Sequence, residues 1–327
     1  MRVANFDQSR EFSGVHLGEA PDPVPASNEV LVHVVATALN RSDLLQVQGY
    51  YPAPADASPI LGLEIAGTII ATGAEVTEYT VGDNVCALVN GGGFAQLASV
   101  PQDMLLPLPE RLSFTKAAAI PEVWLTAYQA LHWIAKIEAG EHVLIHAGAS
   151  GVGTAAIQLA RLAGAIPIVT ASPNKHERLR GLGAERCIDY QRENFAKVAQ
   201  EMTDGKGVEV ILDFIGAPYV KRNAQAVAVD GRALLLGFLG GRYVDNLDVA
   251  PFLLKRIQVT GSTLRNRPAE YKSRLTADFR RDVWEHFSTQ RLQPVVDTIY
   301  DWEETPRAMT YMASNANVGK IVLTIGD

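Results

Sequence analysis

The sequence predicts an α/β protein in which a doubly wound parallel sheet accompanies a β-rich region. Three observations predict this fold class. Residues 1 to about 120 contain strand-forming segments separated by turn residues at short intervals, a pattern typical of a compact barrel-like domain. Beyond about residue 140, apolar strand-like segments alternate with segments whose apolar residues recur at helical spacing. From residue 274 onward, a helix, a strand, a helix and a strand follow one another.

In the first region, residues 30–37 form an almost unbroken run of β-branched and other apolar residues, so we expect a strand there. Residues 65–73 predict a second strand, which ends at a glycine. Residues 81–89 begin as a turn and continue as a strand. Residues 101–109 start and end with proline, and we expect a connector there because proline donates no backbone hydrogen bond.

In the alternating region, we expect strands at residues 142–146, 166–171, 208–214, 233–237 and 257–261, and helices at residues 117–120, 125–131, 154–163, 175–182, 195–202 and 219–226. Such alternation predicts a parallel sheet with helices on both faces. The tail predicts a helix at 274–287, a strand at 295–300, a helix at 305–312 and a strand at 320–325, which we expect to return to the first domain. The expected domains are therefore residues 1–122, 123–262 and 263–327.

The connection after the strand at 142–146 is the most informative segment of the chain. Gly148, Ser150 and Gly153 occupy the three positions of the pattern G-x-G-x-x-G, with serine in place of the middle glycine. Gly151, Gly153 and Ala156 fit the same pattern. Glycines allow the backbone to approach a pyrophosphate, and the following helix offers it free amides and a positive dipole end. The pattern alone is also compatible with an ordinary strand-to-helix turn.

The end of the second strand of such a sheet selects the cofactor. Sites for NAD usually carry an acidic residue there, about 20 residues after the first glycine, but residues 168–175 contain no carboxylate. Ser172 and Lys175 can instead donate hydrogen bonds to a 2′-phosphate, with Arg178 one turn further along. We therefore expect NADPH. The alternative for Lys175 is a solvated surface charge.

The composition limits the partners. The chain has 327 residues and a net charge of −7, which argues against nucleic acid or an anionic membrane as the main partner. Its basic segment, formed by Arg265, Arg267, Lys272 and Arg274, is expected to be a solvated loop. The first residues do not resemble a signal peptide, and no apolar run approaches membrane length, so we expect a cytoplasmic protein.

No convincing metal site is present in the sequence. Its two cysteines, Cys86 and Cys187, allow neither a disulfide framework nor a four-cysteine zinc site. None of the seven histidines forms an H-E-x-x-H motif or pairs with a cysteine at ligand spacing. His33 and His146 lie in or at the end of expected strands, where a structural role is expected.

Six segments together resemble a known family nearly end to end: residues 38–44, 61–67, 81–83, 117–128, 140–161 and 317–322. They resemble the zinc-free quinone oxidoreductases of the medium-chain dehydrogenase/reductase superfamily, and most closely the tumour-suppressor-inducible quinone oxidoreductase subgroup. Zinc-dependent relatives carry Gly-His-Glu where this chain has Gly62-Leu63-Glu64, so leucine replaces a metal-ligand histidine. Glu64 is accordingly expected to be structural.

The resemblance implies a GroES-like catalytic domain, a Rossmann NADPH-binding domain and a tail that returns to the catalytic domain. It implies NADPH-dependent reduction of quinones, ortho-quinones included, by hydride transfer without zinc. Reduction of α,β-unsaturated carbonyls and a non-catalytic, crystallin-like role in NADPH binding are the alternatives. The expected partners are a small-molecule quinone or enone and a second copy of the chain. The homodimer would be joined through the edge of the Rossmann sheet, formed by residues 252–254 and 256–260.

The resemblance also implies individual roles. The residues expected to face the substrate are Asn40, Asp43 and Tyr51. The residues expected to bind the cofactor are Thr126 at the nicotinamide end; Ser150, Gly151, Val152 and Gly153 at the pyrophosphate; Ser172, Lys175 and Tyr190 at the 2′-phosphate; Phe214 and Ile215 on the adenosine side; Phe238 and Leu239 at the carboxamide; and Asn317 from the tail.

Several of these residues also have simpler interpretations. Asn40 and Asp43 could form only a turn after their strand, because such side chains bond their own backbone there. Asp213, at the end of an apolar strand, could be a helix cap. Tyr51 as a proton donor is a hypothesis.

Overall fold

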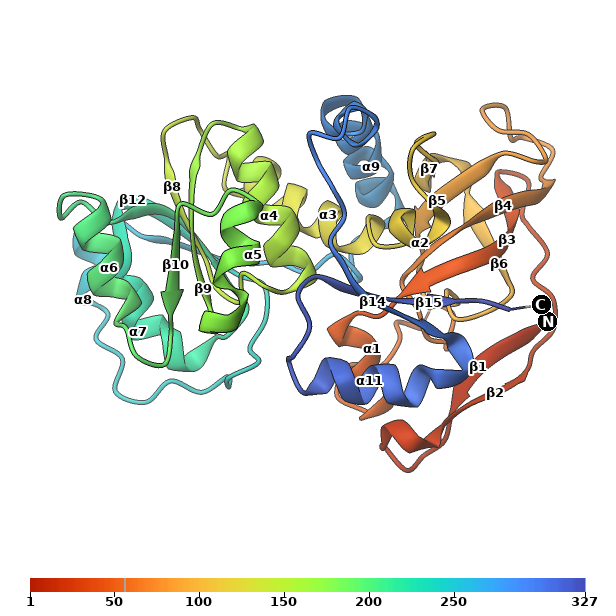
Figure 1. The fold of residues 1–327 in the computed structure, drawn as a ribbon, viewed down its shortest axis with the longest axis horizontal. Coiled ribbons are helices and arrows are strands. Elements are labelled where there is room, and N and C mark those ends of the chain that lie inside the picture. Colours follow the sequence, from red (N-terminus) through yellow and green to blue (C-terminus); the bar gives the residue numbers. More distant parts are fainter. Residues whose placement is uncertain (56, 327) are drawn as a thin grey trace. The chain divides into compact units, whose positions relative to one another are not determined.

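The computed structural model describes residues 1–55 and 57–326, which divide into two compact units (Figure 1). Unit 1 contains Met1–Leu125 together with the chain from Arg265 onward, and unit 2 contains Thr126–Leu264. Helix α3 (Pro121–Tyr128) passes from the first unit into the second and continues as a wider π-helical segment, η3 (Gln129–Ile134). Among the described residues, no helix has both the length and the apolar character needed to cross a membrane.

Unit 2 is built on a six-stranded sheet whose strands are all parallel, in the order β10-β9-β8-β11-β12-β13. The strands are β8 (His142–Ile145), β9 (Ile166–Ala171), β10 (Arg186–Asp189), β11 (Val208–Asp213), β12 (Val227–Leu235) and β13 (Gln258–Gly261). The chain moves outward in one direction from β8 and in the other from β11. The predicted doubly wound sheet is therefore confirmed, with its reversal point between β8 and β11.

Helices cover both faces of this sheet. They are α4 (Gly151–Leu162), α5 (His176–Gly181), α6 (Phe195–Met202), α7 (Ala217–Ala226) and α8 (Ala250–Leu254). In Figure 1, α4 and α5 lie on one side of the strands and α6 and α7 on the other. Leu144, Ile168 and Ile188 of the strands form a core with Phe195 of α6 and Tyr219 of α7.

One strand of unit 2 was missed and one expectation was wrong. Strand β10 was not predicted, because its central apolar pair, Cys187 and Ile188, is too short to give a periodic signal. Residues 252–254, expected at the sheet edge, belong to helix α8 instead. Pro251 lies in the first turn of that helix, where its missing amide costs no hydrogen bond. At this edge of the sheet, the strand is β13, and β10 forms the opposite edge.

Unit 1 contains a seven-stranded, largely antiparallel sheet in the order β14-β15-β3-β4-β5-β7, with β6 also pairing with β3, and a separate β1-β2 pair. Its strands are β1 (Arg2–Phe6), β2 (Val15–Glu19), β3 (Glu29–Ala38), β4 (Glu64–Thr72), β5 (Asn84–Leu88), β6 (Leu97–Pro101), β7 (Leu105–Pro107), β14 (Val296–Asp301) and β15 (Lys320–Thr324). The tail joins this sheet because β15 pairs antiparallel with β3. The proline-bounded connector at 101–109 contains β7, which was not predicted.

The helices of unit 1 are α1 (Arg41–Val47), α2 (Phe114–Ala117), α9 (Ala269–Val283), α10 (Glu285–Ser288) and α11 (Thr305–Ala313). The single helix expected at 274–287 is thus two consecutive helices, α9 and α10. Trp124 of α3 meets Phe287 of α10 edge to face, with ring centroids 4.7 Å apart. This contact anchors the returning tail to the first part of the chain.

Candidate functional site

The turn between β8 and α4 is built so that backbone lies against backbone. A Cβ atom on Gly153 would lie 2.6 Å from the carbonyl oxygen of Gly148 and 2.7 Å from that of Ala147. A Cβ atom on Gly148 would lie 2.6 Å from the Cβ of Val169 in β9. Only glycine fits either position without movement of the neighbouring atoms.

Ser150, which interrupts the glycine pattern, is the N-cap of α4. Its Oγ accepts a hydrogen bond of 3.0 Å from the amide of Gly153. The amides of Gly151 and Val152, in the first turn, have no acceptor within the helix, as at any helix N-terminus. This end of α4 can therefore receive an anion, and the tight turn fits the pyrophosphate of a dinucleotide.

The segments that follow β9 and β10 lie at the same edge of the sheet, because Ala171 is paired with Asp189. Ser172 follows Ala171 and precedes a single 3-10 turn, and Tyr190 follows Asp189. The structure therefore brings Ser172 and Tyr190 to neighbouring strand ends. Lys175 ends the 3-10 turn and is only 9% exposed, so the solvated-charge alternative for this lysine is wrong.

The loops that follow β11 and β12 are also held together. The amide of Leu239 donates to the carbonyl of Phe214 (3.1 Å), and the amide of Gly240 donates to the carbonyl of Ile215 (2.8 Å). Phe238 and Leu239 are 64% and 53% exposed. The structure thus brings together the four apolar residues predicted to line the cofactor site, Phe214, Ile215, Phe238 and Leu239.

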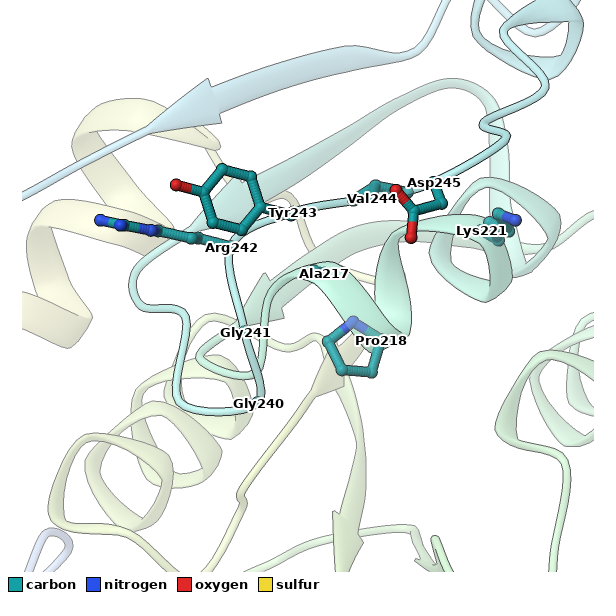
Figure 2. Close-up of a pocket in the computed structure, with 9 residues that line it drawn as sticks. All are labelled: Ala217, Pro218, Lys221, Gly240, Gly241, Arg242, Tyr243, Val244 and Asp245. Carbon is teal, nitrogen blue, oxygen red and sulfur yellow. The ribbon is translucent and has the colours of Figure 1, made fainter.

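Beyond these residues, the chain borders an open pocket of about 450 Å³ (Figure 2). It is lined by Ala217, Pro218 and Lys221 of α7 and by residues 240–245. The amide of Ala217 donates to the carbonyl of Gly241 at 2.9 Å, which holds the loop against the start of the helix. Phe238 and Leu239 lie immediately before this pocket in the chain.

In unit 1, Asn40 and Asp43 form a capping box at the start of α1. The amide of Asn40 donates to Oδ2 of Asp43 (2.7 Å), and the other carboxylate oxygen accepts from the amide of Gly62 (3.2 Å). Asn40 and Asp43 therefore do form the turn after their strand that was the simpler interpretation of these two residues. Burial raises the pKa of Asp43 to about 6, although these two amides oppose the shift.

The carboxylate of Glu64 is fully buried and lies 2.8 Å from Nζ of Lys320 on β15. It also accepts hydrogen bonds from Nδ2 of Asn40 (2.9 Å) and from the amide of Glu122 (2.9 Å). Lys320 in turn donates to Oδ1 of Asn40 (2.7 Å). Nothing in the sequence indicated this partner, because 256 positions separate Lys320 from Glu64 (320 minus 64).

This arrangement does not fit a zinc ion. Leu63, which stands where zinc-dependent relatives carry histidine, is a buried core residue, and Glu64 is neutralised by Lys320. Cys86 is buried, and burial raises the pKa of its thiol, which disfavours the thiolate that a metal needs. Residues 1–55 and 57–326 contain no group of three or more His, Cys, Asp or Glu side chains placed to hold a metal ion.

Tyr51 lies beside Arg265, which was expected only as part of a solvated basic segment. The guanidinium of Arg265 lies 5.3 Å from the centroid of the Tyr51 ring and donates to Oε1 of Gln46 (2.7 Å). The amide of Tyr51 donates to the carbonyl of Leu45 (3.1 Å), so both groups are tied to α1. Burial raises the pKa of the Tyr51 hydroxyl, while the positive charge of Arg265 opposes that shift.

Arg265 is itself buried, with 7% exposure, and its Nε and Nη1 have no hydrogen-bond partner among the described residues. Lys272 is also buried and donates to the carbonyl of Arg265 (2.8 Å). The expectation that these two cations lie in a solvated loop was wrong. An acceptor oxygen brought by a ligand could satisfy the guanidinium, because arginine stays charged when buried.

Glu122, at the start of α3, is a further titratable group of unit 1. Burial, followed by the negative charge of Glu64, raises its pKa to about 7. The two remaining predicted residues are Asn317 and Thr126. Nδ2 of Asn317 donates to the carbonyl of Gly319 (2.7 Å) in the turn before β15, and Thr126 lies in the last turns of α3.

Comparisons with known proteins match both units. Residues 26–110 match the family "Alcohol dehydrogenase GroES-like domain", and residues 151–279 match the family "Zinc-binding dehydrogenase". A phenolphthiocerol synthesis polyketide synthase of Mycobacterium bovis is 36% identical over 310 residues, which are 94% of this chain and 14% of the synthase. Erythronolide synthase of Saccharopolyspora erythraea is 35% identical over 315 residues, 93% of this chain and 8% of the synthase. The chain thus spans a small part of these curated relatives.

Solved structures match the whole chain. An NAD-dependent alcohol dehydrogenase is 29% identical with a TM-score of 0.89, and each chain is covered completely. The CurK enoyl reductase is 28% identical with a TM-score of 0.88, over 99% of both chains. The quinone oxidoreductase of Escherichia coli, solved with NADPH, is 26% identical with a TM-score of 0.89, over 99% of this chain and all of that one.

Proposed function

The chain belongs to the medium-chain dehydrogenase/reductase superfamily, and we propose that it is an NADPH-dependent reductase of conjugated carbonyl compounds that works without zinc. The observation that carries the proposal is the ion pair between Glu64 and Lys320. Lys320 binds the carboxylate of Glu64, which follows Leu63, the residue that stands where zinc-dependent relatives carry histidine. An unconjugated ketone needs strong polarisation, which zinc supplies in zinc-dependent relatives, whereas a quinone or an enone accepts hydride with less such help.

NADPH would supply the hydride. The amides at the start of α4 and the cap residue Ser150 would hold its pyrophosphate, and Ser172, Lys175 and Tyr190 would surround its 2′-phosphate. The apolar walls of the cofactor site would be formed by Phe214, Ile215, Phe238 and Leu239. The tight turn at Gly148 and Gly153 supports this proposal, because a side chain at either position would collide with its neighbours.

Unit 1 would contribute the groups that bind the acceptor and supply the proton. The unsatisfied guanidinium of Arg265 could receive the acceptor oxygen on which negative charge develops. Two groups hold a proton near neutral pH, the hydroxyl of Tyr51 and the carboxyl of Glu122. One proton, together with the hydride, completes the two-electron reduction of either a quinone or an enone.

Both acceptor classes have specific support. Quinone reduction rests on the resemblance to the tumour-suppressor-inducible subgroup and on the likeness to the E. coli quinone oxidoreductase. Enoyl reduction is supported by the polyketide synthase relatives and by the CurK enoyl reductase. Oxidation of NADPH should be followed with 1,2- and 1,4-naphthoquinone, with a 2-enoyl thioester and with no acceptor. Turnover with either class supports reduction, and no turnover with any acceptor would favour a binding role.

Removal of the Lys175 ammonium is expected to weaken NADPH binding at least tenfold and to leave NADH binding unchanged. The reason is that this buried cation would donate to the 2′-phosphate, a group that NADH lacks. Fluorescence titration of the Lys175→Ala variant with both cofactors measures the effect. Equal affinity of the unaltered protein for NADPH and NADH would contradict the assignment. Arg178→Ala, one turn further along, shows whether a second cation contributes.

Replacement of Tyr51 by phenylalanine is expected to lower kcat about 100-fold with the enoyl thioester. The loss with naphthoquinone should be much smaller. The reason is chemical: an enolate must be protonated at carbon, whereas a hydroquinone anion takes its proton from water. Steady-state kinetics of Tyr51→Phe and Glu122→Gln with both acceptors separate the two donors. Full turnover of Tyr51→Phe with both acceptors would rule Tyr51 out.

We also propose that two copies of the chain associate through the free edge of the unit 2 sheet. All four residues of β13 are exposed, and Leu253 and Leu254 of the neighbouring α8 are 79% and 75% exposed. An exposed sheet edge next to exposed apolar side chains favours pairing with another chain. Light scattering at micromolar concentration should give a dimer that Val259→Lys converts to a monomer. A monomeric starting protein would contradict the proposal.

A further inference from the structure

A buried chain of polar side chains lies beneath the carboxyl ends of β9, β8 and β11. Oγ1 of Thr170 lies 3.1 Å from Nδ1 of His146, and Nε2 of His146 lies 2.8 Å from Oδ1 of Asn223. Nδ2 of Asn223 donates to Oδ2 of Asp213 (2.8 Å). His146 and Asp213 are fully buried, and Thr170 and Asn223 are 2% and 6% exposed. Sequence reasoning predicted a structural histidine but could not identify its partners.

The hydrogen bonds between these four side chains all point in one direction, from Thr170 through His146 and Asn223 to Asp213. Because Asn223 uses its amide nitrogen on Asp213, its oxygen faces the imidazole and must accept. Nε2 of His146 therefore carries a hydrogen. Burial lowers the pKa of His146 to about 4, so the ring is neutral and its Nδ1 is an acceptor for the hydroxyl of Thr170. Each of the three hydrogen bonds that join these four side chains thus has a defined donor and acceptor.

Asp213 and Thr170, at the two ends of this row of hydrogen-bonded side chains, hold the turns assigned above to the dinucleotide. Oδ1 of Asp213 accepts hydrogen bonds from the amides of Ile215 (2.7 Å) and Gly216 (3.0 Å), and these bonds fix the turn after β11. At the other end, the carbonyl of Thr170 accepts the amide of Gly148 (3.0 Å), and Ser172 follows two residues later. The glycine turn, the loop of Ser172 and Lys175 and the turn at Phe214 therefore share one hydrogen-bonded support.

The imidazole is held in place by aromatic rings. Phe195 and Tyr219 meet it edge to face, with centroids 4.6 Å and 4.7 Å away. The guanidinium of Arg222 lies 4.6 Å from the centroid of each of these two rings. Because this packing leaves His146 no contact with water, a lost hydrogen bond in the chain could not be replaced by solvent.

We propose that His146, fixed as the Nε2–H tautomer, is a positioning residue that sets the relative placement of the three turns that receive the dinucleotide. It does not touch the cofactor and acts through Thr170, Asn223 and Asp213. This inference rests on the proposed function for the identity of the ligand. A shift of the turns by about 1 Å would separate the pyrophosphate site from the apolar walls and weaken binding.

The test measures NADPH affinity by fluorescence titration and folding by thermal unfolding in a matched set of variants. His146→Leu is expected to raise the Kd for NADPH at least about tenfold, and Thr170→Val to raise it severalfold. Thr170→Ser keeps the hydroxyl and should retain the original Kd. His142→Leu is the control, because His142 begins the same strand at the opposite end and is partly exposed. It should also leave the Kd unchanged.

A merely structural role predicts a lower Tm in His146→Leu and Thr170→Val with an unchanged Kd, and that result would overturn the proposal. If His146→Leu does not fold, Thr170→Val decides the question alone. Nitrogen-15 spectra of the cofactor-free protein give an independent readout, and the neutral Nε2–H tautomer is expected from pH 5 to 8. An Nδ1–H tautomer or an imidazolium would overturn the assignment. If the unaltered protein bound no nicotinamide dinucleotide, the proposed function would fail and the positioning role with it, while the tautomer would still report on the hydrogen-bonded chain.

Discussion

Replacement of Lys320 by methionine is expected to lower the free energy of unfolding by about 3–5 kcal/mol, the cost of leaving one member of a buried ion pair unpaired. Glu64 is fully buried, and Lys320 is its cationic partner at 2.8 Å. The side chain of methionine fills similar space but leaves the carboxylate without a counter-charge. Urea denaturation with linear extrapolation measures the change.

Two further variants show that the loss comes from the unpaired charge. Lys197→Met removes an exposed lysine whose contact with Glu201 spans 3.8 Å on the surface of α6, and it should change stability by less than about 0.5 kcal/mol. The double variant Lys320→Met/Glu64→Gln removes both charges and should recover part of the loss. If Lys320→Met were as mild as Lys197→Met, the carboxylate of Glu64 would not depend on Lys320. Glu64 would then be available as a metal ligand.

Introduction of one methyl group at Gly153 is expected to weaken NADPH binding at least about 100-fold, or roughly 2.7 kcal/mol. The new Cβ would lie 2.6 Å from the carbonyl oxygen of Gly148 and 2.7 Å from that of Ala147. Both atoms are backbone and cannot rotate away, so the turn would have to open. The amides of Gly151 and Val152 would then move from the positions in which they can bind the pyrophosphate.

Gly181→Ala is the matched control for Gly153→Ala. Gly181 also lies in a helix, but a Cβ there would meet nothing within 4 Å. The control is expected to bind NADPH normally and to be slightly stabilised, because alanine has the higher helix propensity. Isothermal titration of both variants measures the difference. Normal affinity of Gly153→Ala would place the pyrophosphate elsewhere.

The local sequence patterns predicted most of unit 2. Residues 166–171 and 195–202 were predicted with the observed bounds of β9 and α6, because each combines a clear apolar pattern with a definite boundary. Strand β10 was missed because only two of its four residues, Cys187 and Ile188, are apolar, and helix α8 was missed because its residues 252–254 were expected at the sheet edge. The turn at Gly148 and Gly153 could be identified because its chemistry depends on consecutive residues.

The polar clusters could not be predicted in the same way. Lys320 meets Glu64, and Arg265 meets Gln46, only because the tail returns to the first sheet, and no local pattern records such a pairing. The partners of His146 lie on β9 and α7, so the imidazole's surroundings depend on the complete sheet. These are side-chain contacts set by tertiary structure, and they decide what the local motifs can do.

The proposed reaction is the reduction of a conjugated acceptor with NADPH and without a metal ion. The most direct test is the initial rate of NADPH oxidation by protein that has been treated with a chelator and shown by elemental analysis to hold far less than one zinc per chain. With the best acceptor of the panel, we expect the same kcat before and after treatment and no increase on addition of Zn²⁺. Loss of turnover on chelation, restored by one equivalent of Zn²⁺, would contradict it.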